Sequence, residues 1–232
     1  MQNAGSKRTA GPPAALSPTS YTILGLLVLR NWSGYQITQQ VRRGLGQLWP
    51  RAERQLYNDP KRLVEGGYVA ATPERVGGRG RTTYSITRRG KAALKGWFAT
   101  PARPPVLEFE AMVRVLFADQ GTLAELRATL EEIAEQARAT RAEYGAFAAH
   151  QVDGGEPYPT RYHTNALAMR FMIGHLEHLI TWSNWALEAT RAWPDTTTPA
   201  TTWADEAAAI FRDAARHAAA ADHGGEGGAP PS

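Results

Sequence analysis

A short basic helix followed by a basic hairpin is the feature of this chain that most restricts its fold. Residues 50–68 read PRAERQLYNDPKRLVEGGY, which opens with a proline and ends with a glycine pair, as helices often do. An interior proline removes a helical hydrogen bond, so Pro60 predicts a kink or a break. Strands are predicted on both sides of GGRG at 77–80, because TTYSI at 82–86 suits a strand. The segment therefore predicts a helix presented beside a two-stranded wing.

The residues around this segment predict its support. A run of apolar residues predicts a first helix over about 18–30, and a second helix is predicted over about 35–45. In the second helix apolar residues recur at every fourth position, which leaves its glutamines and arginines for solvent or phosphate. Thr87 can cap a further helix over 88–98. Three helices followed by a hairpin indicate a winged helix-turn-helix.

The charges of the chain are separated along the sequence. Residues 1–100 contain 16 Lys and Arg and 4 Asp and Glu, a net charge of +12. Residues 101–232 contain 10 and 18, a net charge of −8. A basic module carried on an acidic body is typical of proteins that bind a polyanion.

The wing and the charge together predict a DNA-binding surface. A major groove admits one helix, phosphates on both sides hold it, and an arginine at a hairpin tip can enter the minor groove. The residues predicted to contact DNA are Gln36, Arg51, Arg54, Gln55, Asn58, Lys61, Arg79 and Arg81. The alternative is a coiled-coil adaptor or structural protein whose basic N-terminal domain makes protein contacts.

Five short segments of the N-terminal half also carry a resemblance. They are TILGLL at 22–27, SGYQI at 33–37, QLY at 55–57, KRLVEGGYV at 61–69 and RTTYSITRRG at 81–90. Their order and spacing resemble the PadR family of bacterial transcriptional repressors. The resemblance implies a dimeric winged-helix repressor that binds an inverted repeat and releases it on binding a small molecule, with Tyr35 and Tyr57 at positions that often approach DNA. The chain departs from the family at 58–60, where Asn-Asp-Pro replaces the Pro-Ala-Leu of many members.

The C-terminal half predicts two long antiparallel helices. From Thr122 apolar residues recur at alternating steps of three and four, as in a coiled-coil seam, until VDGG at 152–155. A second long helix follows over about 160–193. The seam would expose an apolar stripe on a single chain, so we expect it to pair two chains in a homodimer. The predicted interface residues are Leu123, Leu126, Leu130, Ile133, Tyr144 and Phe147.

The second long helix is rich in aromatic and sulfur-containing side chains, and two interpretations are open. A dimer core needs such residues, and so does a pocket for a flat aromatic effector. The candidate effector residues are Met169, Phe171, Met172, His175, His178, Trp182 and Trp185. The two histidines lie three residues apart without a third converging ligand, so no metal site is predicted.

The complete prediction is a mainly α protein with a small β wing, a winged helix-turn-helix followed by an antiparallel dimerisation domain. Its segments are a disordered tail at 1–17, the winged helix at 18–99, a proline-rich linker at 100–107, a helical dimerisation and effector domain at 108–194, an accessory segment with a helix at 195–221, and a disordered tail at 222–232. The sequence has no phosphate-binding loop, HExxH motif or serine elbow, so neither an enzyme activity nor a cofactor is predicted. The lack of cysteine and of any long apolar run fits a cytoplasmic protein.

Overall fold

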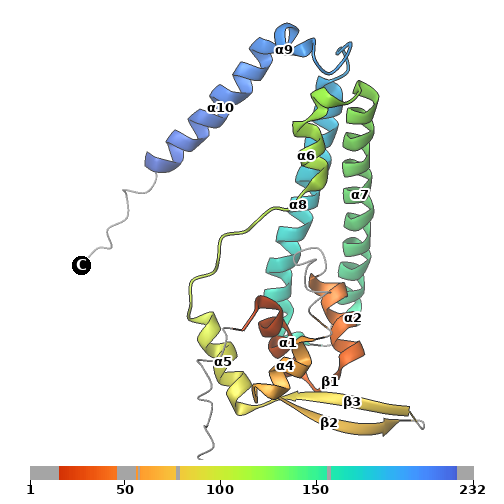
Figure 1. Ribbon diagram of the computed structural model, residues 1–232, viewed down its shortest axis with the longest axis vertical. Helices are drawn as coiled ribbons and strands as arrows, with labels where there is room; N and C mark the ends of the chain where they lie inside the picture. Colours follow the sequence, from red (N-terminus) through yellow and green to blue (C-terminus); the bar gives the residue numbers. More distant parts are fainter. Residues whose placement is uncertain (1–15, 46–55, 57, 77–78, 156–157, 224–232) are drawn as a thin grey trace, which may run out of the picture. The chain divides into compact units, whose positions relative to one another are not determined.

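The computed structural model describes residues 16–45, 56, 58–76, 79–155 and 158–223, and gives the backbone alone for 43–45, 76, 79 and 219–223. The fold is mainly α with one small antiparallel sheet, as the sequence predicts (Figure 1). The chain forms two compact units, Met1–Pro105 and Val106–Ser232. Within the described ranges, no helix is long and apolar enough to cross a membrane.

Helix α1 (Pro18–Leu29) is the centre of the first unit. The Ser17 side chain caps it by accepting a hydrogen bond from the Ser20 backbone N–H at 3.0 Å, and a proline occupies its first turn. The helix packs against α2 (Gly34–Leu45), α4 (Asp59–Glu65) and α5 (Arg88–Phe98). Their shared core consists of buried apolar side chains: Ile23, Leu24, Leu27, Ile37, Val41, Leu56 and Leu63.

The sheet of the first unit has three strands, in the order β1-β3-β2. Strands β2 (Val69–Val76) and β3 (Arg79–Ile86) form the predicted antiparallel hairpin, which is the wing (Figure 1). Strand β1 (Trp32–Ser33) pairs with β3, with Ser33 opposite Thr83. The sequence did not predict β1, because two residues are too short a window for a strand pattern.

Helix α4 has a defined start and a defined end. Leu56 is helical, Asn58 lies in a turn, and α4 begins at Asp59, so the helix breaks where the proline at 60 predicts. At its end Gly67 has a φ of 70°, a conformation that glycine adopts without steric cost. The N–H groups of Gly67 and Tyr68 donate to the carbonyls of Val64 and Leu63, each at 2.9 Å. This pattern is the Schellman motif.

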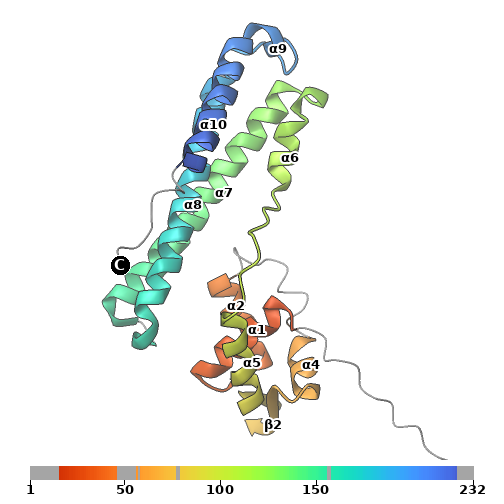
Figure 2. The same cartoon turned by 90° about the vertical axis from the view of Figure 1, so that its left-hand side faces the viewer.

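The second unit is built on two 28-residue helices, α7 (Leu123–His150) and α8 (Tyr162–Ala189), which run antiparallel (Figures 1 and 2). Thr122 and Glu125 form a capping box at the start of α7. The chain then turns through 151–155, where Gly154 has a φ of 88°. The shorter helix α6 (Glu110–Leu116) packs against α7. The predicted pair of long helices is therefore present.

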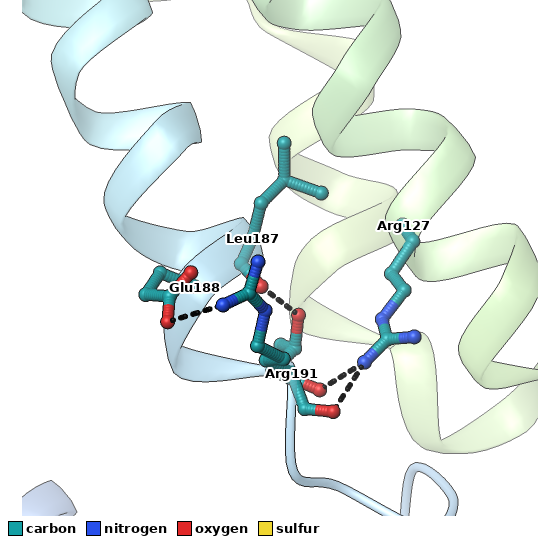
Figure 3. A network of polar contacts seen from close by, with 5 residues as sticks. Arg127, Leu187, Glu188 and Arg191 are labelled. Atoms are coloured by element: carbon teal, nitrogen blue, oxygen red, sulfur yellow. Dashed lines mark hydrogen bonds and ion pairs between the residues drawn. The ribbon is translucent and has the colours of Figure 1, made fainter.

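Arg127 of α7 holds the carboxyl end of α8 (Figure 3). Its guanidinium donates to the backbone carbonyls of Thr190 and Arg191, at 2.5 and 3.0 Å. The last carbonyls of a helix have no partner within the helix, and a basic side chain satisfies them well. An ion pair of 3.3 Å between Arg191 and Glu188 lies beside this contact. No pattern in the sequence predicts this link, because the partners are 63 and 64 residues apart.

The predicted dimer seam on α7 lies mostly inside one chain. Leu126, Leu130 and Ile133 are buried, with exposed fractions of 7%, 1% and 4%, and the first two pack with Ala186 of α8. The prediction that these three residues form an exposed stripe is therefore wrong, because periodicity shows which face of a helix is apolar but not which helix covers it. The other predicted interface residues remain predictions: Leu123 and Tyr144 are half-buried, and Phe147 is exposed.

After α8 the chain forms two more helices, α9 (Pro199–Thr202) and α10 (Ala204–His223). Asp195 organises the connection, because its carboxylate accepts hydrogen bonds from the N–H and hydroxyl groups of Thr197 and Thr198. Helix α10 is the helix predicted within 195–221. Its large apolar side chains, Ile210 and Phe211, are 43% and 76% exposed.

Candidate nucleic-acid interface

The first unit presents polar and basic side chains from α2, α4 and the wing. Tyr35, in the first turn of α2, is 74% exposed. Asn58 and Lys61 are exposed at the start of α4, and Arg62 is exposed beside them. Arg75 is exposed on β2. These side chains are exposed, and contact with DNA stays a prediction for Tyr35, Asn58 and Lys61.

Several of the predicted contact residues are not described. Arg51, Arg54, Gln55 and Tyr57 lie outside the described residues. The backbone of Arg79 pairs with that of Val76 at the outer end of the wing. Their contacts with DNA therefore stay predictions.

Gln36 and Arg81, both predicted to contact DNA, bind each other. The Arg81 guanidinium donates to the Gln36 side-chain carbonyl at 2.5 Å, and both side chains are half-buried. The same carbonyl accepts hydrogen bonds from the Ser33 N–H at 3.0 Å and hydroxyl at 3.2 Å. The Gln36 N–H in turn donates to the Ser33 hydroxyl at 3.3 Å, which completes a capping box at the start of α2. The structure thus gives both residues a role inside the protein, and the pair ties β3 of the wing to α2.

The base of the wing is fixed by hydrogen bonds around Tyr68. Its backbone carbonyl accepts from the Thr87 N–H at 3.1 Å and from the Thr87 hydroxyl at 3.0 Å. That hydroxyl also lies 2.8 Å from the carbonyl of Gly67 and caps α5 by accepting from the Gly90 N–H. The guanidinium of Arg89 lies 4.6 Å from the centre of the Tyr68 ring, a cation–π distance. The end of α4, both strands of the wing and the start of α5 therefore meet at one junction.

The start of α4 is anchored to α1 through a buried carboxylate. Asp59 is 3% exposed, and its Oδ2 accepts hydrogen bonds from the hydroxyls of Ser17 and Ser20, each at 3.0 Å. Asn58 occupies the cap position of α4, so the Asp59 side chain does not cap its own helix. The carboxylate instead joins two helices, so the position of α4 depends on α1.

The candidate effector residues of α8 lie on two faces of the helix. Met172 is 5% exposed and faces the helix pair, whereas Phe171 is 62% and Trp185 49% exposed. Trp182 packs against the buried cluster that joins α7 and α8. The rings of Phe171 and His175 stack with their centres 6.3 Å apart. A single cavity in one chain is therefore not formed by these residues together, and their binding of an effector stays a prediction.

No group of three or more His, Cys, Asp or Glu that would suit a metal occurs among the described residues. A surface groove of the second unit lies between α6 and α7, lined among others by Val113, Phe117, Leu126 and Thr129. None of the seven candidate effector residues lines it.

Comparison with known proteins gives two family matches. Residues 23–96 match the transcriptional regulator PadR-like family, and residues 109–191 match the family described as virulence activator alpha C-term. The negative transcriptional regulator PadR of Bacillus subtilis (strain 168) is 31% identical over 99 residues, which are 42% of this chain and 54% of that protein. The chain thus spans about half the length of this curated relative.

Solved structures resemble both units. PadR of Bacillus subtilis in complex with operator DNA has a TM-score of 0.62 and 22% identity, over 73% of this chain and 97% of that chain. The same protein in complex with p-coumaric acid has a TM-score of 0.57 and 20% identity, over 73% and 96%. The virulence activator AphA of Vibrio cholerae has a TM-score of 0.58 and 25% identity, over 75% and 98%. These likenesses support a winged-helix fold followed by a long-helix unit.

Proposed function

We propose that the chain is a transcriptional regulator of the PadR-like type, and that it is a repressor that binds an inverted-repeat operator as a homodimer; the support is the PadR-like match over residues 23–96 and the similarity to PadR of Bacillus subtilis. In this proposal α4 enters the major groove and the wing contacts the neighbouring phosphates or minor groove. Two winged helices related by a two-fold axis would read two half-sites about one helical turn apart. DNA binding would also place the protein in the cytoplasm.

One observation carries the proposal. Exposed basic side chains of α4 and the wing lie on a unit whose sequence has a net charge of +12 over residues 1–100. The wing that bears Arg75 is held to α2 by the bond between Arg81 and Gln36, so it projects from a fixed base. Neutralising phosphates releases counterions, and this provides much of the affinity of such proteins for DNA. The complex of the Bacillus subtilis relative with operator DNA gives further support.

Binding to duplex DNA at several salt concentrations tests the proposal. DNA from upstream of the protein's own gene is the first probe, with an unrelated duplex of equal length beside it. We expect affinity to fall steeply with salt, and we expect Lys61→Ala and Arg75→Ala each to lower the slope of log K against log salt by about one. Arg141→Ala, an exposed arginine of α7, is the control and should leave the slope unchanged. Equal binding by parent and by the Lys61→Ala/Arg75→Ala double variant would instead favour an adaptor whose basic unit binds protein.

We also propose that a small aromatic compound lowers the affinity for DNA. The support is the aromatic surface of α8 and the p-coumaric acid complex of the Bacillus subtilis relative. A ligand shifts the equilibrium only if it binds the form that does not fit the operator more tightly, with a coupling of about 1–3 kcal/mol in typical systems. p-Coumaric acid is the first compound to titrate, with tryptophan fluorescence and DNA affinity followed in the same samples. Quenching without any change in DNA affinity would contradict this part of the proposal.

A further inference from the structure

Helix α10 lies beyond both family matches, the second of which ends at residue 191. It is amphipathic, because Ala207, Ile210, Phe211 and Ala214 are spaced three and four residues apart and so share one side of the helix. Ile210 and Phe211 are exposed, as is every residue from 209 to 218. A helix with one apolar side usually buries that side against another element. The apolar side of α10 therefore calls for a partner.

The start of α10 is fixed at one end of the second unit. The ring of Trp203, the residue before α10, stands edge-on to the ring of Trp193, with the ring centres 5.4 Å apart. Trp193 packs, together with Ala118, against the buried cluster that joins α7 and α8. In the same connection the Thr196 hydroxyl donates a hydrogen bond to the carbonyl of Gly121 at 3.1 Å. Helix α10 thus begins beside the end of α6 and the start of α7.

The groove between α6 and α7 begins at the same place. Ala118 and Gly121 line its end. Its α6 wall carries Val113 and Phe117, which are 52% and 64% exposed. Its α7 wall includes Thr129, one of the buried residues of α7. Two uncovered apolar surfaces, the groove and one side of α10, therefore start from a common point of the second unit.

We infer that α10 docks into the groove between α6 and α7 of its own chain, with Ile210 toward α6 and Phe211 toward α7. The turn at Trp203, with φ of −122° and ψ of 20°, is the hinge about which the helix closes. In the groove α10 runs parallel to α7. A tethered segment meets its own groove at an effective concentration of about a millimolar, whereas a second molecule is present at much lower concentration. The tether therefore favours the groove of the same chain.

The charges of the two surfaces match in this arrangement. Glu206 shares the edge of α10 that faces α6, where the groove carries Arg114, and Arg212 lies on the opposite edge, toward Glu132 of α7. Arg212 is nine residues after Trp203 and Glu132 is eleven after Gly121, so both lie roughly 15 Å from the end of the groove.

The present partner of Arg114 does not oppose this exchange. Arg114 pairs with Glu110 of its own helix at 2.8 Å, but the two side chains are 64% and 81% exposed. An exposed pair of this kind contributes little to stability, so Arg114 can turn to Glu206 at little cost.

Docking gives α10 a role as a brace of α6. Helix α6 has seven residues, and a helix of that length is not stable without packing. It is also the first helix after Pro105, where the first unit ends. An α10 helix in the groove covers the exposed side of α6 and holds it on α7. The segment that follows the first unit is then anchored by an element from the other end of the chain.

Hydrogen exchange of the α6 backbone amides in the full-length protein tests this role. Ile210→Asp places a charge on the docking side, and the α6 amides should then exchange about tenfold faster than in the parent, because the burial of one large apolar side chain is lost. Ala209→Asp is the matched control, because residue 209 is adjacent but lies on the opposite side of α10. Equal α6 exchange rates in the parent and both variants would contradict the inference.

Cysteine bridging tests the position of α10, because the natural chain contains no cysteine. A short bis-thiol reagent should bridge the Val113→Cys/Ile210→Cys double variant within one chain. The Val113→Cys/Ala209→Cys variant is the control and should stay unbridged.

Three other bridging results would overturn the inference. Bridges only between chains, seen on mixing the Val113→Cys and Ile210→Cys single variants, would show that α10 binds a second copy. A bridge in Trp185→Cys/Phe211→Cys would show that α10 covers α8 instead. The absence of any bridge would leave α10 undocked.

A charge reversal separates docking from a local effect on α6. Arg114→Glu removes the pair with Glu110 and should speed exchange of the α6 amides for that reason alone. If Glu206 lies beside residue 114, the double variant Arg114→Glu/Glu206→Arg should restore slower exchange, since the pair is re-formed with opposite signs. Exchange in the double variant as fast as in Arg114→Glu would contradict the docked position. None of these measurements involves DNA, so their outcome is independent of the proposed function.

Discussion

Gly90 lies directly against Tyr68, so that a Cβ atom at residue 90 would stand 2.2 Å from the Tyr68 backbone carbonyl oxygen. The same carbonyl accepts the hydrogen bonds of Thr87 that join the base of the wing to α5. The glycine therefore lets the first turn of α5 approach the residue where the chain leaves α4. The orientation of α5 relative to the wing depends on this close approach.

Replacing Gly90 by alanine should destabilise the protein. The clash is with backbone, which cannot rotate away, and overfilling of this kind costs about 1–3 kcal/mol. Chemical denaturation followed by circular dichroism measures the loss. Gly96→Ala, in the same helix with nothing within 4 Å of its Cβ position, is the matched control and should be neutral or slightly stabilising. If both variants lose the same stability, the close contact at Gly90 is not the cause.

Removing the buried carboxylate of Asp59 should loosen α4 from α1. In Asp59→Ala the hydroxyl of Ser20, itself 6% exposed, loses its charged acceptor. Loss of such a hydrogen bond costs about 1.5–3 kcal/mol. We expect a lower midpoint of urea unfolding and weaker DNA binding, since α4 would be less firmly placed. Asp213→Ala, which removes an exposed carboxylate of α10, is the comparison and should affect neither measurement.

Arg81 and Gln36 should act on DNA binding as a pair. Because the Arg81 guanidinium is bonded within the protein, Arg81→Ala and Gln36→Ala should weaken DNA binding by similar factors through a less firmly held wing. The loss of affinity in the double variant should be smaller than the sum of the two single losses, since both substitutions remove the contact between Arg81 and Gln36. The measurement is the dissociation constant for DNA of the parent, the two single variants and the double variant, all at one salt concentration. Fully additive losses would mean that each residue contacts DNA independently.

The capping carboxylates of the second unit predict a pH dependence of stability. The backbone N–H and the hydroxyl of Thr122, at 2.7 and 2.8 Å, lower the pKa of Glu125 below its ordinary value of 4.5. The pKa of the Asp195 carboxyl is also lowered, mainly by the hydrogen bond that it accepts from the Thr198 backbone N–H. A carboxyl group whose pKa is lower in the folded than in the unfolded chain stabilises the folded chain at pH values above the unfolded pKa. This stabilisation is lost as the pH falls through the pKa of the folded chain.

A variant that removes the charge of Glu125 tests the direction in which stability changes with pH. Glu125→Gln keeps the capping geometry and removes the charge, so it should lower the Tm at pH 7 by a small amount. The difference in Tm between Glu125→Gln and the parent should shrink as the pH is lowered from 5 toward the pKa of Glu125 in the folded chain. Thermal melts at pH 7, 5 and 3 measure it, and Glu131→Gln on the same helix is the control. A difference that grows toward acid pH would contradict the assignment.

Local signals in the sequence predicted most of the first unit. The proline at 60, the glycine pair at 66–67 and the Thr87 cap act within a few residues of their own position, so their effects are visible in the sequence. The capping box of Ser33 and Gln36 was also visible as S-x-x-Q, but Gln36 was interpreted only as a DNA contact. Its bond to Arg81, 45 residues away, has no sequence signal.

The second unit shows what periodicity leaves open. The apolar period of α7 correctly predicted a long helix with one apolar side, yet Leu126 and Leu130 are covered by α8 of the same chain. A repeat of three and four residues is the same whether the covering helix comes from the same chain or from another. The aromatic set of α8 was treated as one site, although Met172 and Phe171 are neighbours in sequence on different faces. The faces become distinct only when the packing partner is known.

The wing has mechanical properties that follow from its length. Each of its strands has eight residues, and they pair without a bulge from Val69 opposite Ile86 to Val76 opposite Arg79. At about 3.3 Å per residue this is a lever arm of roughly 26 Å, so a tilt of about 5° at its base moves its outer end by roughly 2 Å. That displacement is comparable to the length of a hydrogen bond. A small rotation at the junction of Tyr68 and Thr87 is therefore amplified into the making or breaking of a contact at the tip.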